Sequence, residues 1–175
     1  MNQPLSKRLT APPPKGFREA YDVSGVQYSA VAPAFVRQSQ RRRGRRAAGQ
    51  SYERKVHREL SERYGDFYVP SVWWKFSAAG NLRWCQTDGL LFRFLDRSIT
   101  IIEIKLQHTP DAWWQVKHLY YPVLRKAFPE TIWSFSFCEV VKWYDPAVAF
   151  PEHHHLAIDP LIVPAGKFGV HILRP

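Results

Sequence analysis

A chain of 175 residues with 15% aromatic side chains, seven tryptophans among them, can bury the core of one compact domain. No apolar run is long enough to cross a bilayer, and residues 1–8 do not resemble a secretory leader. Cys85 and Cys138 have no CxxC partner, which argues against a zinc ribbon or a disulfide framework. We therefore expect an intracellular, cytoplasmic protein that does not enter a membrane.

The net charge of +10 is concentrated at one end of the chain. Residues 1–48 carry ten Lys or Arg and two acidic residues, a net charge of +8, and they include five prolines. This composition predicts an extended arm that suits a polyanion such as DNA. The arm ends in a cluster that predicts a phosphate clamp, formed by Arg41, Arg42, Arg43, Arg45 and Arg46. A localisation signal, a solubilising linker and a docking segment for a protein partner are the alternatives.

The first regular element is a helix that starts near Ala47 and ends at Gly65. Its apolar residues recur at every fourth position, at Tyr52, Val56, Leu60 and Tyr64. At about 100° per residue, Glu53 shares the inward face with them. Glu53 is therefore either a helix-dipole partner in the first turn or a functional carboxylate.

Three strands are predicted after this helix. Segment 68–76 is rich in β-formers. Segments 83–94 and 99–107 have the same character, and the turn-forming residues 95–98 lie between them. We expect these two segments to pair as a hairpin at the centre of a sheet.

The second strand of the hairpin carries charged residues in an apolar context. Alternation places Glu103, Lys105 and Gln107 on one face, and Asp88 on the preceding strand is close enough to join them. The simple interpretation is a solvated ion pair on an edge strand. The functional interpretation is a site in which Asp88 and Glu103 hold Mg²⁺ while Lys105 orients and helps deprotonate a water molecule.

A second helix is predicted over 112–127, with Asp111 as its N-cap and Pro122 kinking or dividing it. Segment 131–141 alternates as a strand. The remaining residues are predicted to be mostly loop, with short strand-like ends at 161–163 and 170–173.

The arrangement of Asp88, Glu103 and Lys105 resembles the motif of the PD-(D/E)xK nuclease superfamily. Thr87 stands where the motif name has proline. The predicted order of helix, three strands, helix and strand over residues 49–141 is the core order of that fold, an α/β architecture with a mixed central sheet flanked by helices. The inward Glu53 after Gly49 is similar to the first helix of the superfamily.

The resemblance implies a deoxyribonuclease that depends on Mg²⁺ or Mn²⁺. It implies that Asp88 and Glu103 bind the metal and that Glu53 binds a second ion or its water shell. Gln107 faces the same way as Lys105 and is a candidate contact to water or phosphate. Gln115 resembles the glutamine of a Gln–Tyr element in exonuclease-like members, although Tyr120 follows it by five residues instead of four. Lys117, on the same helix, is either a phosphate contact or a solvated residue.

These patterns divide the chain into a basic arm, 1–48, and a nuclease-like domain, 49–175, whose residues 142–175 form a loop-rich extension. The alternative to an enzyme is a structural or adaptor protein with a nuclease-like fold. Small members of the superfamily also resemble head-completion proteins of tailed phages, which implies capsid or portal partners and a place in the virion. DNA is the expected partner in either case, and a homo-oligomer is compatible with both.

Overall fold

The computed structural model describes residues 20–34, 36 and 44–175, with Arg45 and Arg46 described by their backbone alone. Within these residues, seven strands form one mixed sheet in the order β1-β2-β3-β4-β5-β7-β6. The strands are β1 Val23–Ser29, β2 Tyr68–Ala78, β3 Asn81–Arg93, β4 Ser98–Gln107, β5 Ser134–Trp143, β6 His154–Leu156 and β7 Phe168–Ile172. Neighbours from β1 to β4 pair antiparallel, and neighbours from β4 to β6 pair parallel. The predicted α/β class is confirmed.

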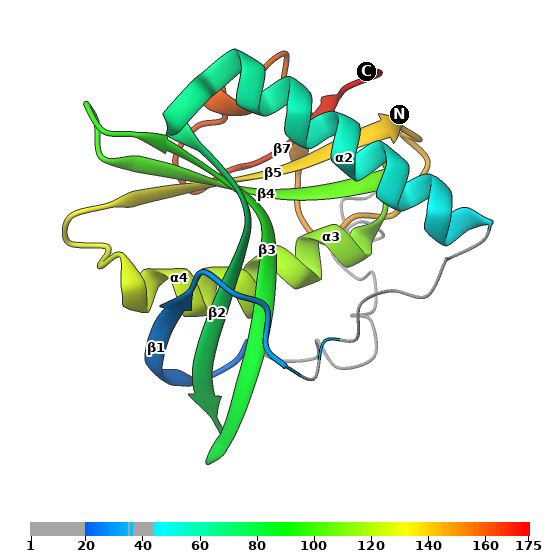
Figure 1. Ribbon diagram of the computed structural model, residues 1–175. Helices are drawn as coiled ribbons and strands as arrows, with labels where there is room; N and C mark the ends of the chain where they lie inside the picture. Colours follow the sequence, from blue (N-terminus) through cyan, green and yellow to red (C-terminus); the bar gives the residue numbers. More distant parts are fainter. Residues whose placement is uncertain (1–19, 35, 37–43) are drawn as a thin grey trace.

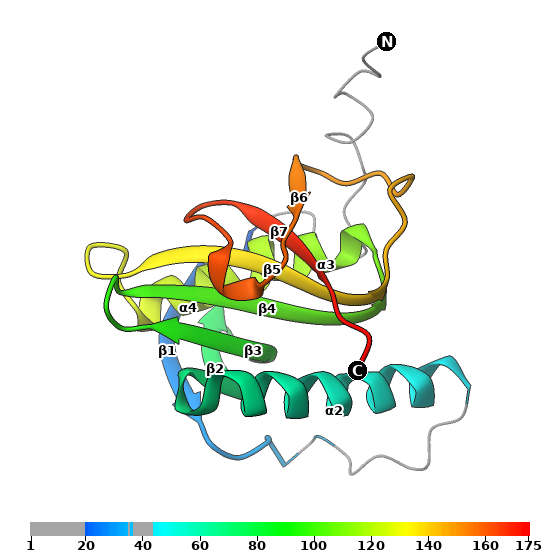
Figure 2. The same ribbon diagram turned by 90° about the horizontal axis from the view of Figure 1, so that it is seen from above.

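Helical segments cover both faces of this sheet (Figures 1 and 2). One face carries α2, and the other carries a helical segment that runs from α3 through a π-helical turn, η2, to α4. Their bounds are α2 Arg45–Tyr64, α3 Pro110–Gln115, η2 Val116–Tyr120 and α4 Tyr121–Ala127, and the 3₁₀ turns are η1 Gly65–Phe67 and η3 Pro160–Ile162. The predicted order of helix, three strands, helix and strand is confirmed over residues 49–141, as is the end of α2 at Gly65, whose φ is 54°.

Strand β4 supplies side chains to both apolar layers. Ile102 and Ile104 pack in the layer that contains Val56 of α2, whereas Ile99 and Ile101 pack in the layer under α3, η2 and α4. This division follows the alternation of side chains along a strand. It puts the other odd-numbered residues of β4, including the charged ones, on the α3–α4 face.

The strand β1 lies on the N-terminal side of the predicted domain boundary at residue 49. It pairs with β2, and only Val23 of its seven residues is buried. Residues 23–29 show no apolar alternation, because a mostly exposed edge strand does not need it; the strand forms through its backbone pairing with β2. The fold therefore includes residues that the sequence assigned to an extended arm.

The helical segment after β4 begins differently from its prediction. Thr109, not Asp111, is the N-cap: its Oγ1 accepts a hydrogen bond from the Asp111 N–H at 3.3 Å, and Pro110 occupies the first helical turn. Pro122 lies in the first turn of α4, where the hydrogen-bond pattern of the continuous helical segment changes from π-helical to α-helical. Proline has no N–H to donate to the carbonyl of His118 four residues earlier. The N–H of Tyr21 donates to that carbonyl instead, at 2.9 Å.

The C-terminal residues contribute more regular structure than expected. Strand β7 adds to the sheet beside β5, starting two residues before the predicted segment at 170. The prediction of a strand at 161–163 is wrong, because a 3₁₀ turn starts there at Pro160. The side chain of Asp159 caps this turn by accepting a hydrogen bond from the Leu161 N–H at 2.7 Å. In the part of the chain that is described, no helix has the length and apolar character needed to span a membrane.

Candidate active site where strands β3 and β4 separate

The candidate site lies where the central hairpin opens. Strands β3 and β4 pair from Arg93–Ser98 as far as Gly89–Ile102 and then diverge. Asp88 is the first β3 residue after this point. Its Oδ2 accepts a hydrogen bond from the backbone N–H of Ile104 at 2.8 Å, which satisfies a donor that β3 no longer reaches. Beyond Gly89, the side-chain carboxylate of Asp88 therefore replaces the backbone of β3 as the hydrogen-bond partner of β4.

The neighbouring strand β2 is irregular at the same level. Its pairing with β3 passes from Pro70–Gly89 to Val72–Thr87, and Ser71 between them has a φ of 53°. A serine in this left-handed region costs on the order of 1–3 kcal/mol, and such residues cluster at functional sites. The irregularity reverses which face of the sheet the even-numbered side chains of β2 occupy. Tyr68 packs in the α2 layer, whereas Val72, four residues later, packs in the α3–α4 layer.

Glu103 and Lys105 form an ion pair on the α3–α4 face of β4, through Glu103 Oε1 and Lys105 Nζ. The Glu103 side chain is 1% exposed and that of Lys105 is 28% exposed, so the pair connects the core to the surface. Glu103 Oε2 is buried without a hydrogen-bond partner. Both side chains act electrostatically on Asp88. The structure thus brings together the three residues that the sequence singled out.

Gln115 and Tyr120 join this group from the helical segment above β4. Lys105 Nζ donates to Gln115 Oε1 at 3.3 Å, and Gln115 Nε2 donates to the buried hydroxyl of Tyr120. The five-residue spacing had excluded Tyr120 from the sequence analysis. At the end of the π-helical turn η2, the N–H of Tyr121 donates to the carbonyl of Val116, five residues earlier. Residues five apart, such as Gln115 and Tyr120, therefore lie as close together here as residues four apart do on an α-helix.

The electrostatics of the site follow from burial. Burial raises the pKa of Asp88 well above its usual range, and the nearby Glu103 carboxylate raises it further, while the Ile104 N–H acts in the opposite direction. Burial also raises the pKa of Glu103, against the influence of Lys105. For Lys105, burial lowers the pKa but the Glu103 carboxylate outweighs it, so the pKa is raised. Two carboxylates therefore share one ammonium.

Glu53 approaches from α2, on the other side of the sheet. Its carboxylate is one of the smaller influences that raise the pKa of Asp88. Glu53 Oε1 lies 3.6 Å from His57 Nε2, and His57 Nδ1 lies 2.7 Å from the hydroxyl of Tyr68. A side chain at Gly89 would meet that hydroxyl at 2.6 Å, so glycine leaves Tyr68 its place beside Asp88. His57 was not among the predicted site residues, although its position four residues after Glu53 on the inward face was a usable signal.

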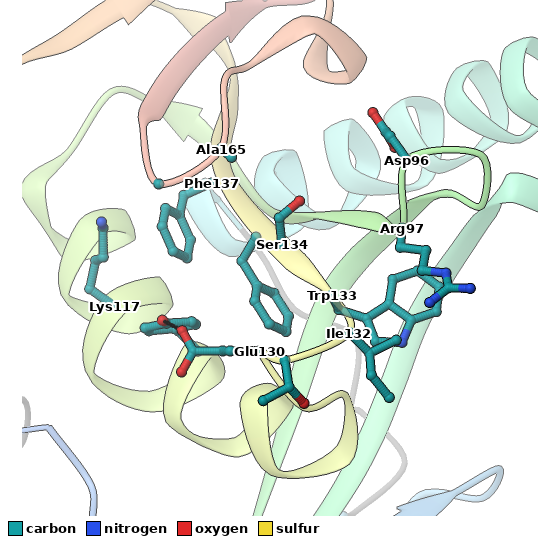
Figure 3. A pocket seen from close by; sticks show the side chains of 13 residues that line it. Asp96, Arg97, Lys117, Glu130, Ile132, Trp133, Ser134, Phe137 and Ala165 are labelled. Atoms are coloured by element: carbon teal, nitrogen blue, oxygen red, sulfur yellow. Dashed lines mark hydrogen bonds between the residues drawn. The ribbon is translucent and has the colours of Figure 1, made fainter.

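In the described part of the chain, the remaining predicted residues form no hydrogen bond or ion pair with this group. Gln107 is exposed at the end of β4. Lys117 lines a separate cavity of about 490 Å³ between the helical segment, β5 and the turn at Asp96 (Figure 3). There its Nζ lies 3.4 Å from Glu152 Oε2 and 4.0 Å from the centre of the Phe137 ring. The predicted phosphate clamp lies outside the description, since Arg41, Arg42 and Arg43 are not among the described residues and Arg45 and Arg46 lack described side chains.

A second buried pair stands beside the site and was missed by the sequence analysis. Glu139 on β5 is in register with Glu103 on β4, and it is fully buried. Its Oε2 lies 2.5 Å from Nδ1 of the buried His108, and its Oε1 accepts from the Thr109 N–H at 3.1 Å. No local pattern indicated this pair, because its members come together only through the parallel pairing of two strands.

In the described ranges, no group of three or more His, Cys, Asp or Glu side chains has the arrangement of a metal site. The pair Asp88 and Glu103 still offers two carboxylates whose ionised forms lack sufficient counter-charge. Comparisons with protein-family models, with curated proteins and with solved structures each gave no match to this chain. Its membership of the PD-(D/E)xK superfamily remains a prediction from the motif.

Proposed function

We propose that this protein is a deoxyribonuclease that depends on Mg²⁺ or Mn²⁺, with Asp88, Glu103 and Lys105 at its catalytic centre. The observation that carries the proposal is the meeting of two carboxylates, an ammonium and an amide where β3 and β4 separate. The motif resemblance and the order of the elements over 49–141 agree with a PD-(D/E)xK nuclease-like core.

Asp88 and Glu103 are the residues that would hold the metal ion. Burial raises the pKa values of both carboxyls, and at Glu103 it outweighs the opposing influence of Lys105 and the Tyr120 hydroxyl, so a bound cation would favour the ionised forms of both. Hard divalent cations prefer carboxylate oxygens. A bound ion of this kind polarises a phosphoryl oxygen and lowers the pKa of a coordinated water molecule.

Lys105 is assigned a charge-stabilising role in this proposal. Because its pKa is raised by Glu103, it remains protonated at neutral pH and serves as a fixed positive charge for the phosphate oxygens. Gln115 positions the ammonium by accepting its hydrogen bond, and Tyr120 holds Gln115. Glu53 on α2 orients water near Asp88 or binds a second ion. Gln107, exposed beyond Lys105, contacts the DNA backbone.

The test is nicking of supercoiled plasmid in Mg²⁺ by wild-type protein and by Glu103→Gln. The proposal expects Mg²⁺-dependent nicking by the wild type and its loss in the variant. Glu62→Gln is the control, since Glu62 is an exposed acid on α2. A wild-type protein that leaves the plasmid supercoiled in both Mg²⁺ and Mn²⁺, or a Glu103→Gln variant that nicks at the wild-type rate, overturns the proposal.

The alternative function is that of an adaptor with a nuclease-like fold, such as a head-completion component that binds DNA or a portal. Two observations on the described residues favour it: Lys105 already neutralises Glu103, and no group of three potential metal ligands is present. An adaptor would bind DNA or its protein partner and leave the plasmid supercoiled. The same plasmid assay, combined with a DNA-binding measurement, therefore separates the two functions.

A further inference from the structure

Trp143 is an exposed aromatic residue on the face of the sheet that carries the candidate site. It ends β5 in register with Gln107, two positions beyond the pair Lys105–Val141. Positions two apart on a strand share a face, so its side chain is on the face of Lys105. Strand spacings place the Cα atoms of Trp143 and Lys105 roughly 8 Å apart. With 52% of its surface exposed, Trp143 is a large apolar side chain directly beside the open end of the site.

Two cations lie over the Trp143 ring. Lys142 Nζ is 5.3 Å from the ring centre and Arg174 Cζ is 5.4 Å from it. Arg174 follows β7, whose Ile172 pairs with Val141, so the chain brings it next to Trp143 from the neighbouring strand. Neither cation forms an ion pair with a described acidic residue. Their charges are therefore available to an anionic ligand.

An exposed aromatic ring flanked by unneutralised cations matches the chemistry of a single nucleic-acid strand. Bases stack on aromatic side chains, and the neighbouring phosphates contact Lys or Arg. In a duplex the base faces are covered by adjacent base pairs except at the two ends, so within the length of a strand an unpaired base is what can lie on such a ring.

We propose that Trp143, with Lys142 and Arg174, is a stacking platform for an unpaired base of a DNA strand that enters the site. The preferred substrate is then DNA with a single-stranded end or segment. This inference rests on the proposed function, because it names the substrate class of the same site.

Phe94 provides a matched control. It is 58% exposed, similar to Trp143, but it follows β3 at the far end of the central hairpin. One face of its ring is already stacked on Phe92, with ring centres 5.7 Å apart and planes at 9°. Truncation of Phe94 removes a comparable exposed aromatic without touching the proposed platform.

The experiment measures the affinity of the full-length chain for labelled oligothymidylate and for a blunt duplex, in EDTA so that no cleavage occurs. Trp143→Ala weakens single-strand binding roughly 5- to 150-fold, and Trp143→Phe retains most of it because an aromatic face remains. Duplex binding changes little in either variant, and Phe94→Ala leaves both affinities unchanged. Equal single-strand affinity in wild type and Trp143→Ala overturns the inference, as does an equal loss for the duplex.

The salt dependence separates stacking from charge. Lys142→Ala and Arg174→Ala each flatten the slope of log affinity against log salt on single strands by about 0.7, whereas Trp143→Ala leaves the slope unchanged. Slopes that stay at the wild-type value in both cation variants contradict the assigned phosphate contacts.

A failure of this inference is distinguishable from a failure of the proposed function. If the wild type never cleaves DNA in Mg²⁺ but Trp143→Ala selectively loses single-strand binding, the platform stands and the nuclease assignment falls. If the wild type cleaves and Trp143→Ala binds and cleaves single strands as well as the wild type does, the nuclease assignment stands and the platform falls.

Discussion

Glu103 and Glu139 stand side by side on β4 and β5, both almost fully buried, yet their surroundings differ. Both oxygens of Glu139 are satisfied, one by His108 and the other by the Thr109 N–H. One oxygen of Glu103 has no hydrogen-bond partner, and the carboxylate faces Asp88 across the open hairpin. Pairing of β5 with both β4 and β7 encloses Glu139, whereas the separation of β3 from β4 opens the sheet beside Glu103.

This difference indicates two roles for buried carboxylates in one sheet. A buried charge whose hydrogen bonds are complete depends on its partners, because removal of one partner leaves an uncompensated buried group and destabilises the fold. A buried charge with an unfilled acceptor and a like charge beside it destabilises the metal-free fold, which is typical of functional sites. We therefore expect Glu139 substitutions to affect stability and substitutions around Glu103 to affect activity.

The largest expected effect is on stability. Glu139→Ala leaves His108 Nδ1 and the Thr109 N–H without their partner in the core, and we expect it to lower the free energy of unfolding by roughly 3–5 kcal/mol. Urea-induced unfolding measures the change, with Glu139→Gln as the isosteric variant that loses less. Cleavage per folded molecule should stay near the wild-type value. A Glu139→Ala protein that folds but has no activity would contradict the assignment of Glu139 to stability and Glu103 to activity.

The next effect concerns the ammonium. Lys105→Ala removes the fixed positive charge proposed to stabilise the phosphate oxygens, and we expect kcat to fall by roughly 10²–10³, similar to the loss of one preorganised electrostatic donor. Single-turnover cleavage at saturating DNA measures this directly. Lys126→Ala on α4, an exposed lysine, is the control. Wild-type kcat in Lys105→Ala would remove this residue from the mechanism.

Metal binding should distinguish the two glutamates by stability alone, without any cleavage assay. Mg²⁺ that binds only the folded state at 100 times its Kd stabilises the protein by about 2.7 kcal/mol. We expect this gain in the wild type and in Glu139→Gln, and its absence in Glu103→Gln. Thermal unfolding with and without Mg²⁺ gives the answer. A wild-type protein whose unfolding temperature does not change in Mg²⁺ would support the adaptor function.

The smallest effect is a gain in stability at the open site. Burial and Glu103 raise the pKa of Asp88 in the folded state above its unfolded value of about 4, so the folded state holds the proton more tightly. The favourable contribution of the protonated form is complete below the unfolded pKa and is lost as pH rises through the folded pKa. Asp88→Asn keeps an acceptor for the Ile104 N–H and carries no charge. We expect it to stabilise the metal-free protein by roughly 0.5–2 kcal/mol at neutral pH.

Unfolding measured in EDTA at several pH values tests the predicted direction of this pH dependence. The stability difference between Asp88→Asn and the wild type should grow as pH rises from about 4 and should be constant below it. Asp66→Asn, a change at an exposed acid, should show no such trend. A difference that shrinks toward neutral pH would mean that the fold stabilises the Asp88 carboxylate, which contradicts the proposed effect of its burial.

Much of the candidate site could be predicted from local sequence patterns. The alternation along β4 places Glu103 and Lys105 on one face, and the hairpin brings Asp88 near them, because strand geometry fixes both results within a few residues. The inward position of Glu53 follows equally from helical periodicity. Where a local rule was misapplied, as at Thr109 and Asp111, the error was confined to the end of one helix.

The rest depended on contacts between distant segments. The π-helical turn that joins Gln115 to Tyr120 forms where Pro122 removes a donor and Tyr21, a hundred residues away, supplies another. Parallel pairing sets Glu139 beside Glu103, and β7 brings Arg174 to Trp143. The sequence by itself therefore determined which residues share a face within one element. The register between separate strands decided which of those faces meet, because backbone pairing carries no sequence code that a single segment can reveal.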